Sequence, residues 1–284
     1  MNDKCFSIPV VTLITAFKCN LNCKHCGAYV PYLKNTLERS NDEIMKGVER
    51  FFKIVDKVEL FTVTGGEPLL YKDLPDLLER ILLNYSDRFV KLQIITNGTL
   101  VPSDKLIDVV KKIGNKFYSF FIDDYGPEIS KKLPEIEKVL KDNDIPYFVR
   151  DYWTENAHCG GWADMGDARK EIHTLEEAQV IYEKCGVPKN GTCSMLTDKI
   201  WYPCDQVFRR LDLGLDVDPN DYVDFDDGST VEQQRNKIRK IYDNKCLNIC
   251  KFCNGMYEGS VRVKAAVQLT PEELQQIKSD LNRS

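Results

Sequence analysis

Three cysteines near the start of the chain have a spacing that suits metal chemistry. Cys19, Cys23 and Cys26 form the pattern CxxxCxxC. Three thiolates on one short loop can hold three irons of a [4Fe-4S] cluster and leave the fourth iron open to a substrate or cofactor. A closed zinc site needs a fourth ligand, here His25 or a remote cysteine. The spacing therefore indicates an open iron-sulfur cluster, with structural zinc as the alternative.

A glycine-glycine-glutamate-proline segment follows at residues 65–68. On its own it could be a turn. The CxxxCxxC loop after a first predicted strand, together with Gly65, Gly66 and Glu67 after a second, resembles the radical S-adenosylmethionine (SAM) superfamily. In that family the open iron is chelated by the amino and carboxylate groups of SAM, and the glycine-glycine-glutamate segment binds the methionine amino group. Glycines there would let backbone carbonyls approach the ammonium closely.

The resemblance implies roles for further residues. His25 takes the place where the family usually has an aromatic residue beside the adenine. Thr96 and Asn97 begin a Thr-Asn-Gly segment that in similar enzymes approaches the ribose or the carboxylate of the cofactor, although Asn-Gly would also serve as a plain turn. Asp123 and Arg150 lie at later strand ends, where the arginine could pair with the SAM carboxylate or form a surface ion pair.

The chemistry that the resemblance implies is a radical reaction. One-electron reduction of the cluster cleaves SAM to methionine and a 5'-deoxyadenosyl radical, which takes a hydrogen atom from an unactivated C–H bond of the substrate. The cofactor does the hard chemistry, while the protein holds the target carbon close and excludes water. The resemblance also implies an electron donor such as flavodoxin or ferredoxin as a partner.

A second group of cysteines lies towards the C-terminus. Residues 192–204 contain a turn at residues 197–199 and predict a β-hairpin with a cysteine on each arm. The region resembles the auxiliary-cluster extension of radical SAM enzymes of the SPASM and twitch subfamilies. The shorter twitch version implies one second [4Fe-4S] cluster. We expect Cys193, Cys204, Cys250 and Cys253 as its ligands, with Cys246 able to replace one of them. Four cysteines so spaced are equally compatible with zinc.

Of the eleven cysteines, Cys5, Cys159 and Cys185 remain. A free cysteine is commonly a small buried hydrophobic residue, and that is the default for each. Cys159 lies in a glycine-rich segment, residues 158–162, just beyond the last predicted strand. A thiol there could return a hydrogen atom to a substrate radical, and Cys246 could do so if it is not a ligand.

The elements that would position these residues alternate between strand and helix over residues 1–150. Such alternation predicts βα units on a parallel sheet, with the chemistry at the carboxyl ends of the strands. The resemblance implies an α/β fold class, a partial (β/α)6 TIM-like barrel open on one side for substrate. Strands are predicted at residues 10–16, 58–64, 91–96, 117–122 and 147–150. Helices are predicted at residues 41–55, 74–84, 103–113 and 134–142.

After about residue 155 the regular alternation of predicted strands and helices ends. Helices are predicted at residues 175–184, 231–242 and 271–282. We expect the radical SAM partial barrel at residues 1–175, a small cysteine-rich auxiliary-cluster domain at 176–260 and a C-terminal helical tail at 261–284. Residues 212–227 include seven aspartates, but their spacing matches no standard calcium site, so we expect a solvated surface loop.

The composition argues against several classes of protein. A net charge of -5 and a pI of about 5.4 give no basic footprint for nucleic acid. No apolar run reaches the roughly 18 residues that would span a membrane. The first residues lack the apolar core of a signal peptide. We therefore expect a cytoplasmic protein with no nucleic-acid or membrane partner.

Similar enzymes with a single auxiliary cluster act on sugars or aminoglycoside-like compounds, by dehydrogenation or epimerisation. We therefore expect a carbohydrate-like small-molecule substrate and an oxidoreductase or epimerase. The first strand is predicted at Val10, which leaves no room for a leader-peptide recognition domain, although modification of a ribosomal peptide is the alternative. The non-enzyme alternative is a structural zinc protein or an iron-sulfur redox sensor. A sensor would ordinarily carry a DNA- or partner-binding element, and none is visible in the sequence.

Overall fold

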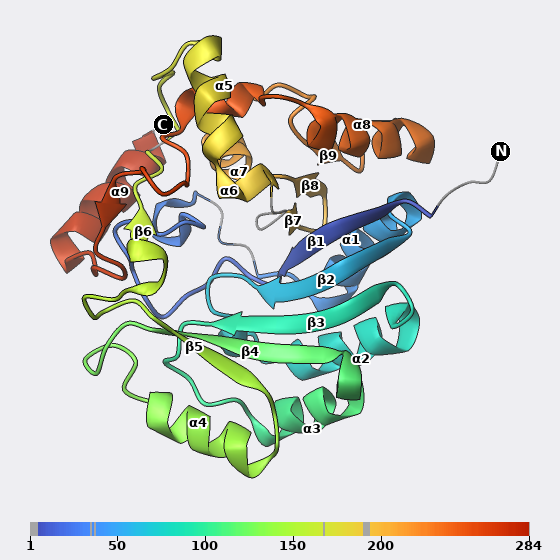
Figure 1. Cartoon of the computed structure of the whole chain (residues 1–284), viewed down its shortest axis with the longest axis vertical. Coiled ribbons are helices and arrows are strands. Elements are labelled where there is room, and N and C mark those ends of the chain that lie inside the picture. Colours follow the sequence, from blue (N-terminus) through green and yellow to red (C-terminus); the bar gives the residue numbers. More distant parts are fainter. Residues whose placement is uncertain (1–4, 35, 37, 167, 190–193, 284) are drawn as a thin grey trace.

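A parallel sheet organises the computed structural model, which describes residues 5–34, 36, 38–166, 168–189 and 194–283 (Figure 1). Its first five strands pair in chain order, each parallel to the next. They are β1 (Ser7–Ile14), β2 (Lys57–Thr64), β3 (Phe89–Thr96), β4 (Phe117–Asp124) and β5 (Tyr147–Asp151). All five predicted strands are confirmed, with small shifts at their ends. The α/β fold and the parallel sheet are therefore as expected, and they are consistent with a partial barrel.

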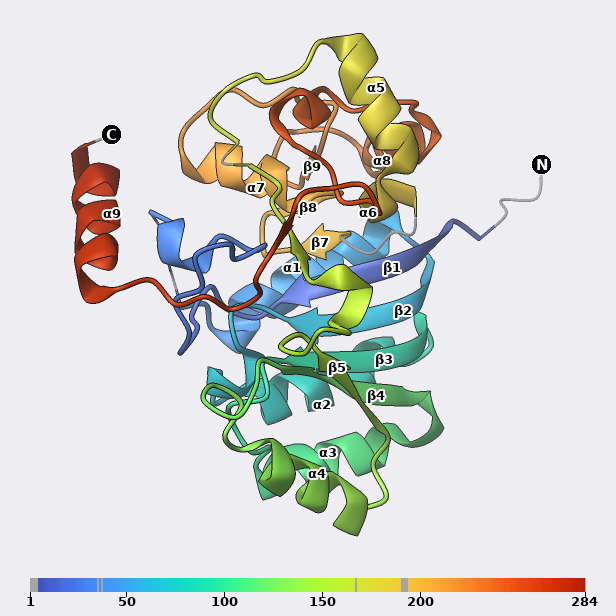
Figure 2. The same ribbon diagram turned by 60° about the vertical axis from the view of Figure 1, so that its left-hand side comes forward.

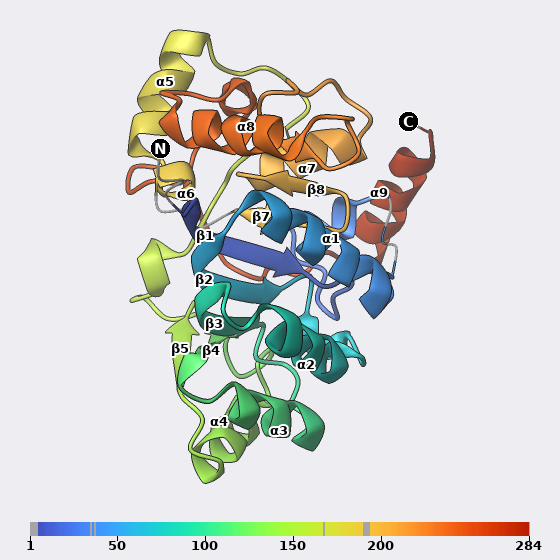
Figure 3. The ribbon, with the colours of Figure 1, turned by 90° about the vertical axis from the view of Figure 1, so that its right-hand side faces the viewer.

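Four helices connect these strands and cover one face of the sheet (Figure 3). They are α1 (Asn41–Ile54), α2 (Leu74–Tyr85), α3 (Asp104–Ile113) and α4 (Leu133–Asp142). Each helix turns an apolar stripe towards the strands, so that Val48, Leu77 and Phe61 are fully buried between the two layers. Short 3-10 turns complete the connections: η1 (Val30–Tyr32), η2 (Pro68–Leu70), η3 (Gly114–Lys116) and η4 (His158–Gly160).

The sheet continues beyond β1 on its other side. There β7 (Met195–Leu196) pairs parallel with β1, and β8 (Ile200–Tyr202) and β9 (Val223–Asp224) follow in antiparallel register. The predicted hairpin is confirmed as β7 and β8, but it extends the central sheet across the predicted boundary at residues 175 and 176. That boundary stays a prediction. Of the two arm cysteines, Cys204 follows β8, and Cys193 lies outside the described residues.

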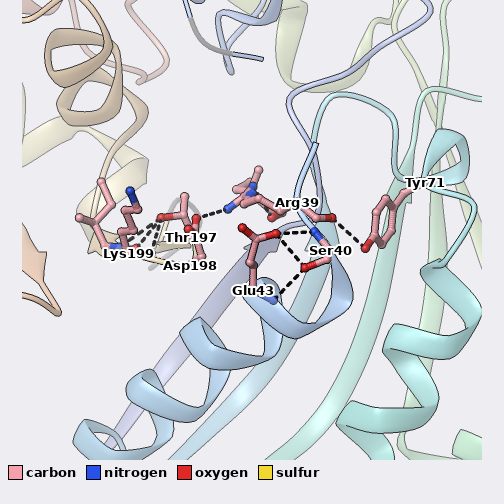
Figure 4. Close-up of polar contacts among 9 residues, drawn as sticks. Arg39, Ser40, Glu43, Tyr71, Thr197, Asp198 and Lys199 are labelled. Atoms are coloured by element: carbon pink, nitrogen blue, oxygen red, sulfur yellow. Dashed lines mark hydrogen bonds and ion pairs between the residues drawn. The ribbon is translucent and has the colours of Figure 1, made fainter. Parts of the chain in front are cut away.

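The turn of this hairpin is tied to the start of α1 (Figure 4). The guanidinium of Arg39 pairs with Asp198 in the turn at 2.8 Å and donates to the carbonyl of Ile14 at 3.0 Å. Next to Arg39, Ser40 and Glu43 form a capping box that fixes the first turn of the helix. Because Arg39 contacts both β1 and the turn, it holds the hairpin against the first βα unit.

The second half of the chain packs over the β7–β9 edge (Figure 1). It contains α5 (Leu175–Lys184), α6 (Gly186–Lys189), α7 (Asp205–Asp212), α8 (Val231–Asp243) and the 3-10 helix η5 (Asn248–Phe252). The predicted helices at residues 175–184 and 231–242 are confirmed. The buried side chains of α8, among them Ile238 and Ile241, join the same apolar core as the sheet.

The aspartate-rich segment 212–227 is only partly a solvated loop, so that prediction needs correction. The carboxylate of Asp221 is 2% exposed and accepts from the backbone N–H groups of Asn248 and Ile249 at 3.2 and 2.7 Å. Burial raises its pKa to about 6. Asp212 likewise accepts from the N–H of Lys34. Both carboxylates thus accept hydrogen bonds from backbone N–H groups of other segments.

The C-terminal segment returns to the first cysteine loop (Figure 2). There β10 (Arg262–Val263) pairs antiparallel with β6 (Trp162–Ala163), and the chain then passes beside residues 22–24 before it ends in α9 (Pro271–Arg283). The predicted helix at residues 271–282 is thereby confirmed. None of the helices in the described ranges combines the length and the hydropathy of a membrane span.

Candidate functional site

The first cysteine set lies on the loop that leaves the carboxyl end of β1. Cys23 is buried, while Cys19 and Cys26 are partly exposed. The sulfur of Cys19 accepts from the N–H of Leu21 at 3.4 Å and from the amide of Asn97 at 3.6 Å. Burial raises the pKa of Cys23 to about 11 and that of Cys26 to about 12. Donors aimed at a sulfur stabilise the thiolate, which is the form that binds metal.

The glycine-glycine-glutamate segment packs directly on this loop. The N–H of Gly66 donates to the carbonyl of Ala16, and the N–H of Glu67 donates to that of Lys18, both at 2.8 Å. A Cβ at Gly65 would lie 2.5 Å from the Ala16 oxygen, and one at Gly66 would lie 2.3 Å from the Lys18 oxygen. The two loops can therefore approach this closely only if both residues are glycine, a reason that is independent of the predicted contact with SAM.

Glu67 joins the segment to the end of β3. Its side chain is 1% exposed and accepts from the N–H of Leu69 at 3.0 Å, from the hydroxyl of Thr96 at 2.8 Å and from the N–H of Asn97 at 2.7 Å. Burial raises its pKa to about 7, against the opposing effect of these three donors. The amide of Asn97 also reaches Asn20 at 3.0 Å, so the Thr-Asn-Gly segment contacts both motifs.

Asp123 and Arg150 face each other across β4 and β5. The Nε of Arg150 lies 2.6 Å from the carboxylate of Asp123, and the hydroxyl of Tyr125 donates to the same carboxylate at 3.2 Å. Burial raises the pKa of Asp123, although Arg150 acts in the opposite direction. The ion pair given as the alternative role of Arg150 is therefore present, and it is partly buried. A role of Arg150 towards the SAM carboxylate stays a prediction.

Two cavities border the first cysteine loop, and a third lies further along the carboxyl edge of the sheet. His25 and Cys26 line one of about 400 Å³ together with Tyr29 and residues 163–166. A second, of about 550 Å³, lies beside Cys19 and extends to α9. A third, of about 410 Å³, lies between the ends of β4 and β5 and residues 264–268, with Tyr125 and Tyr152 in its wall. The motifs therefore border space in which small molecules could bind.

The structure leaves the two predicted hydrogen donors in different surroundings. Cys159 is exposed on η4, with a left-handed backbone at φ 53°, next to Tyr152 and His158. Cys246 instead shares a hydrogen bond with Cys250, which lowers the pKa of Cys246 and raises that of Cys250. Cys246 therefore belongs with the second cysteine set.

The second set gathers around a small cavity whose lining is otherwise mostly apolar. Four thiols border it: Cys185, Cys204, Cys250 and Cys253. Three of them are predicted ligands. The fourth, Cys185, was not among the expected ligands, because its default interpretation from sequence is a small buried hydrophobic residue. Cys185 caps the C-terminus of α5, and its sulfur accepts from the N–H of Met256 at 3.4 Å. The signal in the sequence was that Cys185 directly follows a predicted amphipathic helix.

The donor chemistry of both sets suits iron-sulfur clusters. Within the described ranges, no three His, Cys, Asp or Glu side chains converge as the ligands of a single metal ion. A [4Fe-4S] cube is larger than one ion and holds its thiolates further apart. Three thiols on one loop, and four around one cavity, supply the sulfur ligands that such clusters take.

One buried contact connects the two cysteine sets. Tyr29 follows Cys26 and donates from its N–H to the Cys26 carbonyl at 3.0 Å. Its hydroxyl accepts from the amide of Gln206 at 2.6 Å and donates to the carbonyl of Gly166 at 3.0 Å. Gln206 lines the cavity of the second set. Tyr29 thus lies between the two candidate metal centres.

Comparison with known sequences places a domain on the first half of the chain. Residues 13–142 match the family model of the Radical SAM superfamily. A probable GTP 3',8-cyclase of Methanococcus vannielii is 31% identical over 126 residues, which are 44% of this chain and 40% of that protein. The GTP 3',8-cyclase of Limosilactobacillus fermentum is 31% identical over 119 residues, 41% of this chain and 34% of that protein. The chain thus spans two fifths or less of the length of these relatives.

Solved structures share the fold over nearly the whole chain. BtrN, in complex with AdoMet and 2-DOIA, has a TM-score of 0.56 at 18% identity and matches over 94% of this chain and all of that chain. Native anSMEcpe with bound AdoMet has a TM-score of 0.53 at 16% identity, over 97% of this chain and 96% of that chain. The likeness therefore includes the cysteine-rich second half of the chain.

Proposed function

We propose that this chain, which carries a radical SAM superfamily domain in residues 13–142, is an enzyme that reductively cleaves SAM. Cys19, Cys23 and Cys26 would hold a [4Fe-4S] cluster, which with SAM supplies a 5'-deoxyadenosyl radical for hydrogen abstraction. One observation carries the proposal: the cysteine loop and the glycine-glycine-glutamate segment are locked together by two backbone hydrogen bonds. Structural zinc would account for the thiols but not for the match of residues 13–142 to the radical SAM family model.

The chain's own residues would hold and orient the cofactor. Glu67 keeps the ends of β2 and β3 in fixed register, because its carboxylate accepts from both Thr96 and Asn97. The amide of Asn97 also donates to the sulfur of Cys19, so the same fixed segment orients this thiol. Arg150 is held by Asp123 through its Nε, and its other N–H groups would pair with the SAM carboxylate. Such fixed donors lower the cost of orienting a reactive ligand.

For the second cysteine set we propose a [4Fe-4S] cluster held by Cys185, Cys204, Cys250 and Cys253. These thiols border one cavity, which adds Cys185 to the candidate ligands, while Cys193 lies outside the described residues and stays a predicted ligand. Cys246 remains the reserve ligand because it contacts Cys250. A cluster with four cysteine ligands has no open iron and would carry electrons or anchor the surrounding loops. This cluster would define an auxiliary domain of the twitch type over residues 176–260.

We propose a carbohydrate-like small molecule as the substrate. The cavity between β4, β5 and residues 264–268 is lined by Tyr125, Tyr152 and Trp153, and Glu128 and Lys264 also border it. Aromatic faces pack against the C–H faces of sugar rings, and charged groups bind hydroxyl or amino substituents. The electron that reduces the cluster would come from a flavodoxin- or ferredoxin-like donor.

Two outcomes can follow hydrogen abstraction. In dehydrogenation the substrate radical would lose a proton to solvent and an electron to the second cluster. In epimerisation it would take a hydrogen atom from a thiol, for which Cys159 is the exposed candidate beside Tyr152, and the thiyl radical left on Cys159 would regain a proton from solvent and an electron from the second cluster. Substituting Cys159 by alanine separates them, because epimerisation then stops while 5'-deoxyadenosine still forms, whereas dehydrogenation continues.

The proposed function is tested by anaerobic purification and cluster reconstitution, followed by iron and sulfide counting. Dithionite and SAM are then added, and 5'-deoxyadenosine is measured. We expect about eight irons per chain in the wild type and about four in Cys23→Ala, which should form no deoxyadenosine. Cys5→Ala is the matched control, because Cys5 is exposed and outside both sets. Bound zinc without SAM cleavage would overturn the proposal.

A further inference from the structure

The segment after β10 runs alongside the first cysteine loop (Figure 2). Gln268 lies opposite Cys23 in an antiparallel bridge. The N–H of Lys24 donates to the carbonyl of Val267 at 2.7 Å, and the N–H of Leu269 donates to that of Asn22 at 2.8 Å. We call residues 265–283 the C-terminal strap. It lies outside the matched domain, yet it pairs with the backbone between two of the candidate cluster ligands.

The side chain of Gln268 completes this pairing. Its oxygen accepts from the N–H of Asn22 at 2.8 Å, and its nitrogen donates to the sulfur of Cys23 at 3.3 Å and to the carbonyl of Ala266 at 2.7 Å. These partners fix which way the amide faces. The Asn22 N–H can only donate and the Ala266 carbonyl can only accept, so the amide nitrogen must lie on the sulfur side.

The strap is also anchored on either side of Gln268. Before it, Ala266 is 1% exposed and has a left-handed backbone at φ 52°, a conformation that non-glycine residues keep only where packing enforces it. After it, Glu273 in the first turn of α9 pairs with Lys24 at 3.3 Å. Further along α9, Leu274 and Lys278 line the cavity beside Cys19.

We propose that the C-terminal strap is part of the cluster site and that Gln268 is a positioning residue that raises the reduction potential of the cluster. This inference rests on the proposed function. Reduction adds negative charge to a cluster and its thiolates, and an N–H donor to a ligand sulfur stabilises that charge. Removing the donor therefore makes the cluster harder to reduce. The same side chain holds the loop amides in place, as groups beyond the ligands of a metal site commonly do.

Gln268→Glu keeps the shape of the side chain and the acceptor for Asn22, but removes the N–H donor and adds a negative charge. Its carboxylate still accepts from Asn22 but offers Cys23 a negative oxygen in place of an N–H. Gln276→Glu is the matched control, since Gln276 is exposed on α9 and donates to Asp280 at 2.8 Å, away from the cysteine loop. In an anaerobic redox titration followed by electron paramagnetic resonance, we expect about a tenfold lower ratio of reduced to oxidised cluster in Gln268→Glu at a fixed potential. For one electron this corresponds to a shift of about 59 mV.

Gln268→Leu serves as the second variant, because it removes all three side-chain hydrogen bonds without adding charge. We expect a potential shifted in the same direction, and faster hydrogen exchange at the Asn22 and Lys24 amides of the cluster-free chain. A wild-type potential in both Gln268 variants would overturn the inference, even if they lost iron, because that would leave Gln268 a structural role only. Failure of the wild type to bind a cluster would instead count against the proposed function.

Discussion

The carboxyl group of Glu67 is almost completely buried. It is held there by three donors from two loops, and burial still raises its pKa to about 7. In the unfolded chain this carboxyl ionises at its ordinary pKa, near 4.5. Between these two values the folded state binds more protons than the unfolded state. The free energy of unfolding therefore falls as the pH rises through this window.

The substitution Glu67→Gln should remove this dependence, because glutamine resembles the neutral acid at every pH. We expect the unfolding free energy of the variant, relative to that of the wild type, to rise by about 2 kcal/mol from pH 5 to pH 8. Urea unfolding of the cluster-free proteins at several pH values measures it. Glu49→Gln, at an exposed position on α1, is the control and should show no such trend. A constant difference between Glu67→Gln and the wild type would show that Glu67 is ionised throughout.

Cys185 is the ligand assignment that most needs testing. If Cys185, Cys204, Cys250 and Cys253 hold the second cluster, Cys185→Ser should retain the first cluster and lose about four of about eight irons. Iron and sulfide counts after reconstitution measure this, with Cys159→Ser as the control at an exposed thiol. A full complement of iron in Cys185→Ser, with loss in Cys246→Ser instead, would transfer the role to Cys246.

The first cysteine set could be predicted from sequence because its members are local. A spacing of CxxxCxxC on one loop brings three thiols together whatever the rest of the chain does. The second set is assembled by tertiary packing, since Cys185 ends α5, Cys204 precedes α7 and Cys250 lies in η5. No spacing rule shows which of these ends meet. Sequence analysis therefore grouped Cys204, Cys250 and Cys253 as expected ligands but did not show that Cys185 lies beside them.

Among the elements, α1 and the β7–β8 turn approach each other unusually closely. A Cβ at Gly47 would lie 2.5 Å from the carbonyl of Thr197 and 2.6 Å from the Cα of Asp198. Both are backbone atoms and cannot rotate away. The helix and the hairpin are thus in contact through a glycine in mid-helix, a position where alanine would otherwise favour the helix by about 1 kcal/mol.

Gly47→Ala should therefore destabilise the protein despite the better helix propensity of alanine. We expect the free energy of unfolding to fall by about 1 to 3 kcal/mol, because the added methyl forces the hairpin turn away from α1. Equilibrium unfolding in urea measures the change. Lys46→Ala, at an exposed site on the same helix, should stay within about 0.5 kcal/mol of the wild type. A stabilised Gly47→Ala variant would show that the hairpin can move without cost.

The order of the strands shows which part of the sheet could not be predicted from the sequence. The five parallel strands and their helices follow from short β-branched runs alternating with amphipathic stretches, signals that are local. The pairing of β7 with β1 joins residues 195–196 to residues 12–13, and the ion pair of Arg39 with Asp198 fixes it from outside the sheet. Such pairings depend on contacts far apart in sequence, so the hairpin could be predicted but its place in the sheet could not.

Across the whole molecule, Tyr29 is where the two cysteine-rich regions meet. Its backbone is bonded to Cys26, and its hydroxyl bridges Gln206 and Gly166. The phenol is 8% exposed, so any polar group left without a partner here would be shielded from water. Buried groups that lose a partner cost about 1 to 3 kcal/mol each. The relative position of the two candidate clusters therefore depends on the few atoms that make this contact.

Tyr29→Phe removes the hydroxyl and keeps the ring. We expect the free energy of unfolding to fall by about 1 to 2 kcal/mol in the cluster-free protein, because the Gly166 carbonyl and the Gln206 amide each lose a partner. Urea unfolding measures it, with Tyr118→Phe as the control, since Tyr118 is 44% exposed. In a double-mutant cycle with Gln206→Leu, an interaction energy of about 1 kcal/mol is expected. Simple additivity of the two substitutions would mean that the regions are held together elsewhere, and Tyr29 would then contribute only to its own loop.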